Sequence, residues 1–315
     1  MDICDQDLEV YGPDSGGLIE AWADEYIPLS PWTHVSKRLR DELRRRLGAL
    51  QRRPRTILSA VFAGPLPPRA DVENYALYNV GGRLASATSE GLRFEHRPKS
   101  PASRSGRTFR HSWRYQPVEA GAPFVSWKEV RPVVRWRALQ LSHFQAGKEA
   151  GPVWYAVRHG DVDGYEPRGP NEVFGVRLTL HAPHGRYRSA AAAIKGSIDG
   201  AIAGFQAQAD FSLARQGSQH LAVSLGVPAA EIYESLVGTD RALLGVADRL
   251  VDLRGAGVQW KPDDHECVAA ELRLEQISGA VCSIAGQISI LESINQTPLG
   301  AAAAPGEPST PPAIA

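Results

Sequence analysis

The sequence has no long hydrophobic run, and no stretch approaches the ~20 apolar residues of a membrane-spanning helix. Its N-terminal stretch is acidic and lacks a basic region followed by an apolar one, so we expect no secretory signal. The three cysteines are scattered and form no CxxC pair, which indicates free thiols in a reducing compartment rather than a disulfide framework. We therefore expect a cytoplasmic protein with no membrane segment.

Several motifs of common catalytic folds are also missing. The sequence contains no GxxxxGK[ST] phosphate loop, no complete GxGxxG after a strand, no GxSxG nucleophile elbow and no HExxH zinc motif. These absences argue against nucleotide-driven motors, dinucleotide-dependent dehydrogenases and the common serine and zinc hydrolases.

Charge of both signs is present in equal amounts, but it is segregated along the chain. Residues 1–30 carry eight acids and no lysine or arginine, residues 34–198 carry a net +16, and residues 199–315 carry a net −8. A basic face raises the local potential for polyanions whatever the total charge is. Two outcomes stay open: the acidic ends neutralise the basic middle, or the middle presents a surface to a nucleic acid, another polyanion or an acidic protein partner.

The hydrophobic pattern predicts an α+β protein whose sheet is mostly antiparallel or mixed and is packed by helices. Apolar residues recur at steps of three and four after Thr33, which indicates an amphipathic helix that Ser30 or Thr33 caps and Pro54 ends. Helices are expected at 33–50, 71–80, 189–210, 217–225 and 228–237.

Short runs rich in β-branched and aromatic residues predict the strands. They are expected at 56–64, in several segments of 106–182 that include "PVWYAVRHG", and at 267–292, where two strands form a hairpin near Ser278-Gly279. The stretch 81–105 is expected to be a long loop, broken only by "GLRFEHR".

The domain organisation follows from composition. We expect a loosely docked acidic segment at 1–30, a main domain at 31–214, and a smaller helix-plus-hairpin region at 215–295 that is either separate or part of the main domain. The Pro/Ala-rich tail at 296–315 is expected to be disordered. No internal repeat is evident at a fixed period.

The helix expected at 189–210 carries three glycines at intervals of four residues: Gly196, Gly200 and Gly204. Each glycine inside a helix costs about 0.5–1 kcal/mol relative to alanine. The expected compensation is the close approach of another backbone, from a sheet or a second helix.

The stretch "RADVENY" places Asp71, Glu73 and Asn74 within four positions. In extended chain Asp71 and Glu73 point the same way, and with Asn74 they make a candidate catalytic site for Mg²⁺, which prefers oxygen ligands. If instead a helix starts at Asp71, the two acids diverge by about 200°. Asp71 then caps the helix and Glu73 lies at the positive end of its dipole, which is the interpretation we favour.

This segment resembles the acidic "PD(I/L)DN" segment of Holliday junction resolvases of the RusA type, whose aspartates bind Mg²⁺. The likeness covers about six residues after a strand and a proline-containing turn, with Glu73 in place of the second aspartate and Ala70 in place of the proline. The lysine that follows in that family is missing. The resemblance implies Mg²⁺-dependent cleavage of a phosphodiester.

A lysine and a further acid could come from the glycine-striped helix. Lys195 and Asp199 are four positions apart and so share one face. The simplest interpretation is an exposed ion pair. The functional one makes Asp199 a third metal ligand beside Asp71 and Glu73, and Lys195 a catalytic group that stabilises charge on a phosphate.

Other clusters of potential ligands are weaker. His159, Asp161 and Asp163 alternate in "RHGDVDGYEP", but the flanking glycines favour a polar turn. His265 and Cys267 in "DDHEC" lack the second ligand pair that zinc sites show.

Basic and aromatic residues interleave along the predicted strands and one helix. Such residues bind single-stranded nucleic acids through phosphate contacts and base stacking, although buried rings with arginines on the other face give the same pattern. The candidate nucleic-acid-binding residues are Arg44, Arg45, Arg110, Trp113, Arg114, Arg135 and Arg137.

These features lead to two functional hypotheses. The first is a protein that acts on nucleic acid, as a Mg²⁺-dependent phosphodiesterase or nuclease. The second is a non-catalytic interaction protein whose basic middle docks an acidic partner or its own acidic ends.

Overall fold

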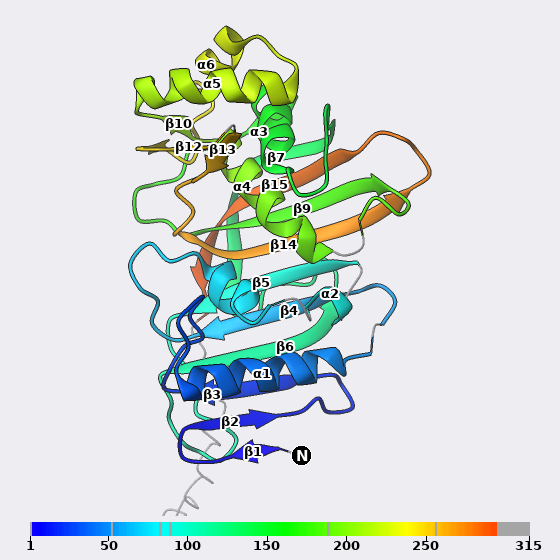
Figure 1. The fold of residues 1–315 in the computed structure, drawn as a ribbon, viewed down its shortest axis with the longest axis vertical. Coiled ribbons are helices and arrows are strands. Elements are labelled where there is room, and N and C mark those ends of the chain that lie inside the picture. Colours follow the sequence, from blue (N-terminus) through cyan, green and yellow to red (C-terminus); the bar gives the residue numbers. More distant parts are fainter. Residues whose placement is uncertain are drawn as a thin grey trace, which may run out of the picture.

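The computed structural model describes residues 2–51, 53–81, 84–87, 90–187, 190–255 and 257–294. Its central feature is one mixed sheet of 11 strands in the order β1-β2-β3-β6-β4-β5-β14-β9-β15-β7-β8. Helices cover one face of this sheet along most of its length (Figure 1). The α+β class with a mixed sheet is therefore confirmed, whereas the tail at 296–315 lies outside the described residues. No helix in those ranges is long and apolar enough to cross a membrane.

The first half of the chain builds one end of the sheet. The main helix of this half is capped by Thr33, one of the two residues expected to do so. The Thr33 hydroxyl accepts a hydrogen bond from the Ser36 backbone N–H. The elements are β1 (Ile3–Cys4), β2 (Leu8–Tyr11), β3 (Ile19–Ala23), α1 (His34–Gly48), β4 (Thr56–Ala63), the π-helix η1 (Asn74–Tyr78), α2 (Leu84–Ala87), β5 (Gly91–Arg97) and β6 (His111–Glu119).

The second half builds the other end of the sheet and carries an additional group of helices. Its elements are β7 (Trp127–Gln140), α3 (Ala150–His159), β8 (Val162–Gly164), β9 (Phe174–Pro183), the 3₁₀-helix η2 (Ala190–Ala192), α4 (Ile194–Gly204), β10 (Ala207–Gln208), α5 (Phe211–Leu225), α6 (Ala229–Val237), β11 (Val246–Ala247), β12 (Val251–Arg254), β13 (Gly257–Trp260), β14 (Cys267–Ile277) and β15 (Ser283–Ser293).

The two halves repeat one arrangement of four strands, although the sequence shows no repeat. The first half has the order β3-β6-β4-β5 and the second the order β7-β15-β9-β14. In each half the two strands next to the junction are parallel, β4 with β5 and β9 with β14. The strand that comes last in the chain, β6 or β15, is antiparallel to both of its neighbours within its half. Because β5 and β14 pair antiparallel at the junction, the halves are related by an approximate twofold axis through this pair.

The connections in the two halves also correspond. α1 and α3 follow the first strand of each half, and the helical segments η1–α2 and η2–α4 join the second strand to the third. The segments η1–α2 and η2–α4 therefore meet over the β5–β14 junction, where α2 contacts η2. Only the second half has a long insertion, residues 205–266, between its last helix and its third strand.

The glycine stripe of α4 is explained by α3. A Cβ on Gly200 would lie 2.5 Å from the Ala150 carbonyl oxygen, and one on Gly204 would lie 2.1 Å from a Val157 methyl carbon. The predicted close approach is thus confirmed, and the neighbour is a helix. This packing holds α4 over β9 and β14.

Three local expectations are wrong. Residues 1–30 are not loosely docked, because they form β1, β2 and β3, and Leu8 and Ile19 are fully buried. The run "PVWYAVRHG" is the helix α3 rather than a strand. A short apolar run fits a buried helix as well as a strand, and here its contact with α4 decides the outcome.

The third concerns the C-terminal strands, which exist but do not form a hairpin with each other. β9 lies between them, parallel to β14 and antiparallel to β15. The stretch 81–105 was expected to be a long loop broken only by "GLRFEHR", and that segment is β5, a central strand whose Leu92 and Phe94 belong to the core.

Candidate functional site

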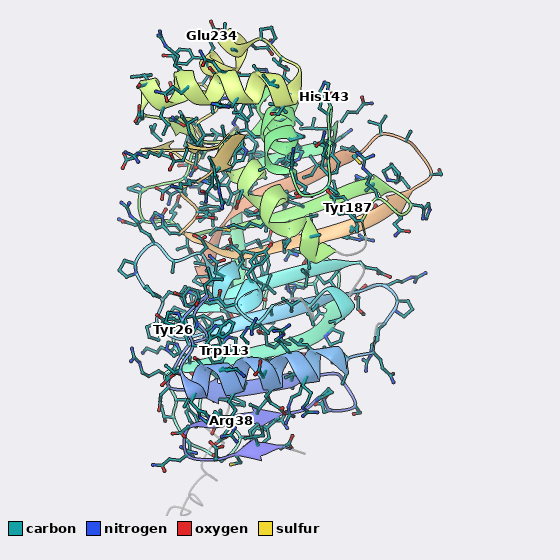
Figure 2. The ribbon with its side chains drawn as sticks, viewed as in Figure 1. Tyr26, Arg38, Trp113, His143, Tyr187 and Glu234 are labelled. Carbon is teal, nitrogen blue, oxygen red and sulfur yellow. The ribbon has the colours of Figure 1, made fainter. Side chains whose placement is uncertain are left out.

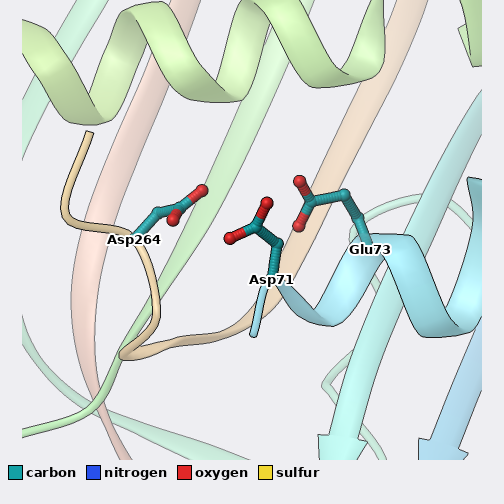
Figure 3. Close-up of side chains that lie close together, drawn as sticks. All are labelled: Asp71, Glu73 and Asp264. Carbon is teal, nitrogen blue, oxygen red and sulfur yellow. The ribbon is translucent and has the colours of Figure 1, made fainter. Parts of the chain in front are cut away.

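Three carboxylates converge in front of the junction between the two halves. Ligand oxygens of Asp71, Glu73 and Asp264 all lie within 4.8 Å of one another. Figure 3 shows the three side chains pointing toward one another beneath helix α4. Asp71 directly precedes the helical turn that leads into η1, and Glu73 lies in that turn. Asp264 lies in the loop that ends the insertion and leads into β14.

The local conformation at Asp71 matches neither of the two alternatives drawn from the sequence. The helical turn begins at Val72, directly after Asp71, so the segment is not extended. The Asp71 carboxylate accepts a hydrogen bond from the Asn74 side-chain amide at 3.0 Å. Because Asp71 lies outside the helix, its side chain is not bound to the helical 100° step, and it converges with Glu73 instead of diverging from it.

Lys195 links this triad to Asp199. Its ammonium nitrogen donates to Glu73 Oε1 at 2.5 Å and lies 3.6 Å from Asp71 Oδ2 and 3.5 Å from Asp199 Oδ1. The Lys195 backbone N–H also donates to the Tyr78 hydroxyl at 3.2 Å. Helix α4 of the second half is thereby attached to η1 of the first.

The acids outnumber the cations at this position, and the pKa values reflect it. Burial, followed by repulsion from Glu73, raises the pKa of Asp264 to about 9. Burial also raises the pKa of Asp199 to about 7, although Lys195 opposes the rise. Burial likewise raises the pKa of Glu73. Lys195 alone does not offset these acids, so the cation-free cluster holds protons that a bound cation would displace.

The donor set fits a hard divalent cation. Carboxylate oxygens are the ligands that Mg²⁺ and Ca²⁺ prefer. The three oxygens lie within 4.8 Å of one another, so side-chain rotation is enough to bring them onto one ion.

Asp199 lies across Lys195 from the triad. Its side chain is 9% exposed, and its Oδ1 has no hydrogen-bond partner among the residues that the structure describes. The structure brings together Asp71, Glu73, Asn74, Lys195 and Asp199, all of which were predicted as site residues. The third carboxylate of the triad is nevertheless Asp264, and direct ligation by Asp199 stays a prediction.

Asp264 could have been found only weakly from the sequence. It stands in "DDHEC", where the adjacent histidine and cysteine drew attention to zinc instead. In the structure His265 pairs with Asp263 at 2.5 Å, and the Cys267 thiol is buried toward the Ala269 carbonyl oxygen. The useful signal is the position of these acids directly before a strand.

The alternating residues of "RHGDVDGYEP", for which a polar turn was favoured over a metal site, are not among the metal-ligand groups of the described residues. His159 ends α3, and its Nε2 lies 2.9 Å from the Ser235 hydroxyl. Asp163 lies on the short edge strand β8. These two side chains belong to different elements and do not share a site.

A cleft of about 910 Å³ opens beside the triad, between the start of α3, helices α4 and α5, and the β12–β13 hairpin. Tyr78, Lys195 and Asp199 line the end nearest the triad. His143 lies at the upper part of this region, near α3 (Figure 2). The remaining lining comes mostly from residues 145–152 at the start of α3 and from the insertion, the latter including His220, Ser224 and Trp260.

The predicted nucleic-acid surface is not assembled as one track. Trp113 is only 1% exposed, and its indole N–H donates to the Tyr75 carbonyl oxygen, so it cannot stack on a base (Figure 2). Arg114, on β6, and Arg135 and Arg137, on β7, alternate with the core residues Trp113 and Trp136 and therefore point to the opposite face of the sheet.

The predicted arginines are also far apart. Five strands separate β6 from β7, which places these strands about 29 Å apart at the usual ~4.8 Å spacing. Arg44 and Arg45 lie on α1, and Arg45 pairs with Glu42 at 2.7 Å. Arg110 is exposed beside a different cavity, near Tyr26. Their role in nucleic-acid binding stays a prediction, without the common surface that it assumed.

The segregated charge is partly neutralised within the chain. Acids of the N-terminal segment pair with arginines of the basic middle. The pairs are Asp2–Arg46, Asp5–Arg38, Glu9–Arg107 and Glu20–Arg104, with N···O distances of 3.2, 2.6, 3.6 and 2.8 Å. The first of the two outcomes left open by the charge distribution is therefore seen at this end of the molecule.

Comparison with known proteins gives no family. No family model matches the chain, and no curated protein matches it significantly.

Proposed function

We propose that the protein is a divalent-cation-dependent hydrolase of phosphate esters, with its catalytic centre at Asp71, Glu73 and Asp264. The observation that supports this most is the convergence of three carboxylates from two halves of the chain within 4.8 Å, around a lysine that does not balance their charge. A structural ion pair needs no third and fourth acid, and their mutual repulsion costs stability unless a ligand relieves it.

The residues have distinct roles in this proposal. Asp71, Glu73 and Asp264 hold the cation, preferably Mg²⁺. A bound divalent cation supplies Lewis-acid polarisation of the phosphate and a hydroxide at neutral pH. Lys195 faces the same space and stabilises the negative charge that develops on the phosphate oxygens. Glu73 and Asp199 hold the Lys195 ammonium in place from two sides, and Asn74 orients Asp71.

A nucleic acid strand remains one substrate within this class, as the resemblance of "RADVENY" to resolvases implies. The dispersal of the predicted arginines removes the main sequence argument for a long polymer. Heparin retention and salt-sensitive binding of DNA or RNA test that narrower version, because phosphate contacts weaken steeply with salt.

The central test measures the metal and the reaction separately. Titration of the native protein with Mn²⁺ or Mg²⁺ is expected to show one bound ion, and hydrolysis of bis(p-nitrophenyl) phosphate is expected to require it. Glu73→Gln and Asp264→Asn keep the side-chain shape and are expected to abolish both. Glu292→Gln, at an exposed position on β15, is the matched control and should change neither. A native protein that takes up no divalent cation contradicts the proposal and favours the non-catalytic alternative.

A further inference from the structure

We infer that the cleft beside the carboxylate triad binds a small phosphate ester of about nucleotide size, with its flat ring against Trp260 and its phosphate at Lys195. This inference names the substrate class of the proposed catalytic centre and rests on that proposal for its chemistry, but not for its binding test.

The insertion in the second half is the first support. Its counterpart in the first half is almost absent, since α2 ends at Ala87 and β5 begins at Gly91. The insertion packs on α3 and α4 through a small core of its own, in which Leu250 and other insertion residues surround Trp154 of α3. It contributes both the far wall of the cleft and Asp264 of the triad. One addition to a duplicated scaffold thus completes the cation site and encloses the space beside it.

The cleft and the triad share Lys195. Lys195 and Asp199 line the cleft, and the Lys195 ammonium also contacts Glu73 and Asp71 of the triad. The buried Asp199 carboxylate has its Oδ1 3.5 Å from the same ammonium nitrogen. A ligand in the cleft that reaches Lys195 therefore lies next to the proposed catalytic centre.

The size and lining of the cleft define the ligand. A volume of about 910 Å³ lies in the range of small-molecule sites, roughly 300–1,000 Å³. Trp260 is half-buried, held by Trp154 at 5.3 Å between ring centroids, and offers a fixed aromatic surface. Base–aromatic stacking of this kind is tolerant of base identity. The far side is lined by apolar residues of α5 such as Leu221 and Leu225.

Charge in the cleft accommodates an anionic group together with the proposed cation. Lys148 and Lys195 line it with His143 and His220, and the two acids that face it are Glu149 and Asp199. Glu149 is already occupied by hydrogen bonds from Tyr187 at 2.8 Å and from the Gly147 backbone N–H at 2.5 Å. A cation at the triad would offset the remaining acids, so that a phosphate at Lys195 and a flat ring at Trp260 fit the two ends of the cleft.

The test is equilibrium binding of methylene-phosphonate analogues, which a phosphate-ester hydrolase cannot cleave, to the full chain in the presence of Mg²⁺. The analogue of adenosine 5′-monophosphate carries a phosphonate and a flat ring, and the analogue of ribose 5-phosphate lacks the ring. The native protein is expected to bind the first at least tenfold more tightly than the second. Trp260→Ala should remove that difference. Trp32→Ala, at a 41% exposed tryptophan on the other half, is the matched control and should preserve it.

A second variant guards against misfolding of the first. Val223 is 87% exposed and lines the cleft, so Val223→Trp should fold normally and obstruct the opening, weakening both probes at least tenfold. Equal affinity for the two probes, equal effects of the two tryptophan variants, or binding of an oligonucleotide but not of the adenosine monophosphate analogue would overturn the inference. Mg²⁺ uptake without nucleotide binding overturns the inference alone, whereas nucleotide binding without Mg²⁺ uptake or hydrolysis overturns the proposed function alone.

Discussion

The two faces of the sheet each carry a buried cluster of charges, and the clusters are built differently. On the face opposite the helices, Arg93 and Arg177 lie among Glu95, Glu129 and Glu271. Arg177 contacts Glu129 at 2.6 Å and Glu271 at 2.9 Å. Arg93 lies 3.6 Å from Glu95 and 3.8 Å from Glu271.

The backbone completes this rear cluster. Three N–H groups of the loop after β6 donate to its carboxylates: Gly121 to Glu271, and Val125 and Ser126 to Glu95. The Ala122 carbonyl oxygen of the same loop accepts hydrogen bonds from both Arg93 and Arg177. Each charge thus has its partners within the chain, as a buried ionic network requires.

The front cluster of Asp71, Glu73, Asp199, Asp264 and Lys195 lacks such completion. Its one ammonium group pairs with three of the four carboxylates, those of Asp71, Glu73 and Asp199, and the pKa values of Asp199 and Asp264 are raised to about 7 and about 9. The difference teaches that burial of charge alone does not mark a functional site. A buried charge cluster becomes a candidate functional site when acids and cations within the chain do not balance and a cleft lies next to it.

The largest expected effect comes from breaking the rear cluster. Arg93→Met keeps most of the side-chain volume but leaves Glu95 and Glu271 without one cation. We expect the free energy of unfolding to fall by about 3–5 kcal/mol, as for removal of one partner of a buried ion pair. Denaturant unfolding measures it. Unchanged stability would mean that the rear cluster is not the self-contained network described above.

The next effect concerns the front cluster and its ligand. A divalent cation at 100 times its dissociation constant should stabilise the native protein by about 2.7 kcal/mol. The expected readout is a rise in melting temperature with Mg²⁺ or Ca²⁺ that Glu73→Gln abolishes. Arg93→Met, although less stable, should retain the rise, because the rear cluster lies on the other face of the sheet. Loss of the rise in Arg93→Met but not in Glu73→Gln would reverse the assignment of the two clusters.

A smaller effect follows from pH. The pKa values of Asp264 and Asp199 are higher in the folded protein than the ordinary value of 3.8, so the folded state holds more protons between pH 4 and 9. Stability of the cation-free protein should therefore fall as pH rises through this window. Asp264→Asn should lessen the fall and be more stable than the native protein near pH 9. Asp248→Asn, at an exposed position, is the control. Parallel pH profiles for native protein and Asp264→Asn would contradict the raised pKa.

The smallest effect trims the rear cluster without uncovering a charge. Ser59 accepts a hydrogen bond from Arg93 Nε at 3.3 Å. Ser59→Ala should cost about 0.5–1.5 kcal/mol, the usual value of one hydrogen bond. Cation binding at the front should be unchanged in a titration. A loss beyond that of Arg93→Met would show that Ser59 does more than complete the network.

Local pattern was sufficient for much of the secondary structure. The apolar spacing after Thr33 predicts α1 and its cap. The glycine stripe predicts that α4 packs against another backbone. Both patterns can be recognised from residues that are close together along the chain. The same pattern could not distinguish helix from strand at α3, where the outcome depends on contact with α4.

The candidate site was predicted in its residue types but not in its assembly. Asp71 and Glu73 stand out because they are close in sequence, and Lys195 and Asp199 because they are one helical turn apart. The meeting of these two pairs depends on the antiparallel β5–β14 junction, which no local pattern contains. The predicted basic surface failed for a related reason, since strand order separates β6 from β7 and alternation buries Trp113.

The sequence by itself determined the α+β class, most helices and the identity of the acids and the lysine at the front cluster, because helical and strand periodicity are short-range properties. Only the tertiary structure decided that two unrelated-looking halves repeat one topology, that β9 separates the last two strands, and that Asp264 joins Asp71 and Glu73. Strand pairing acts across more than a hundred residues, and it is this long-range order that sets which charges remain unbalanced.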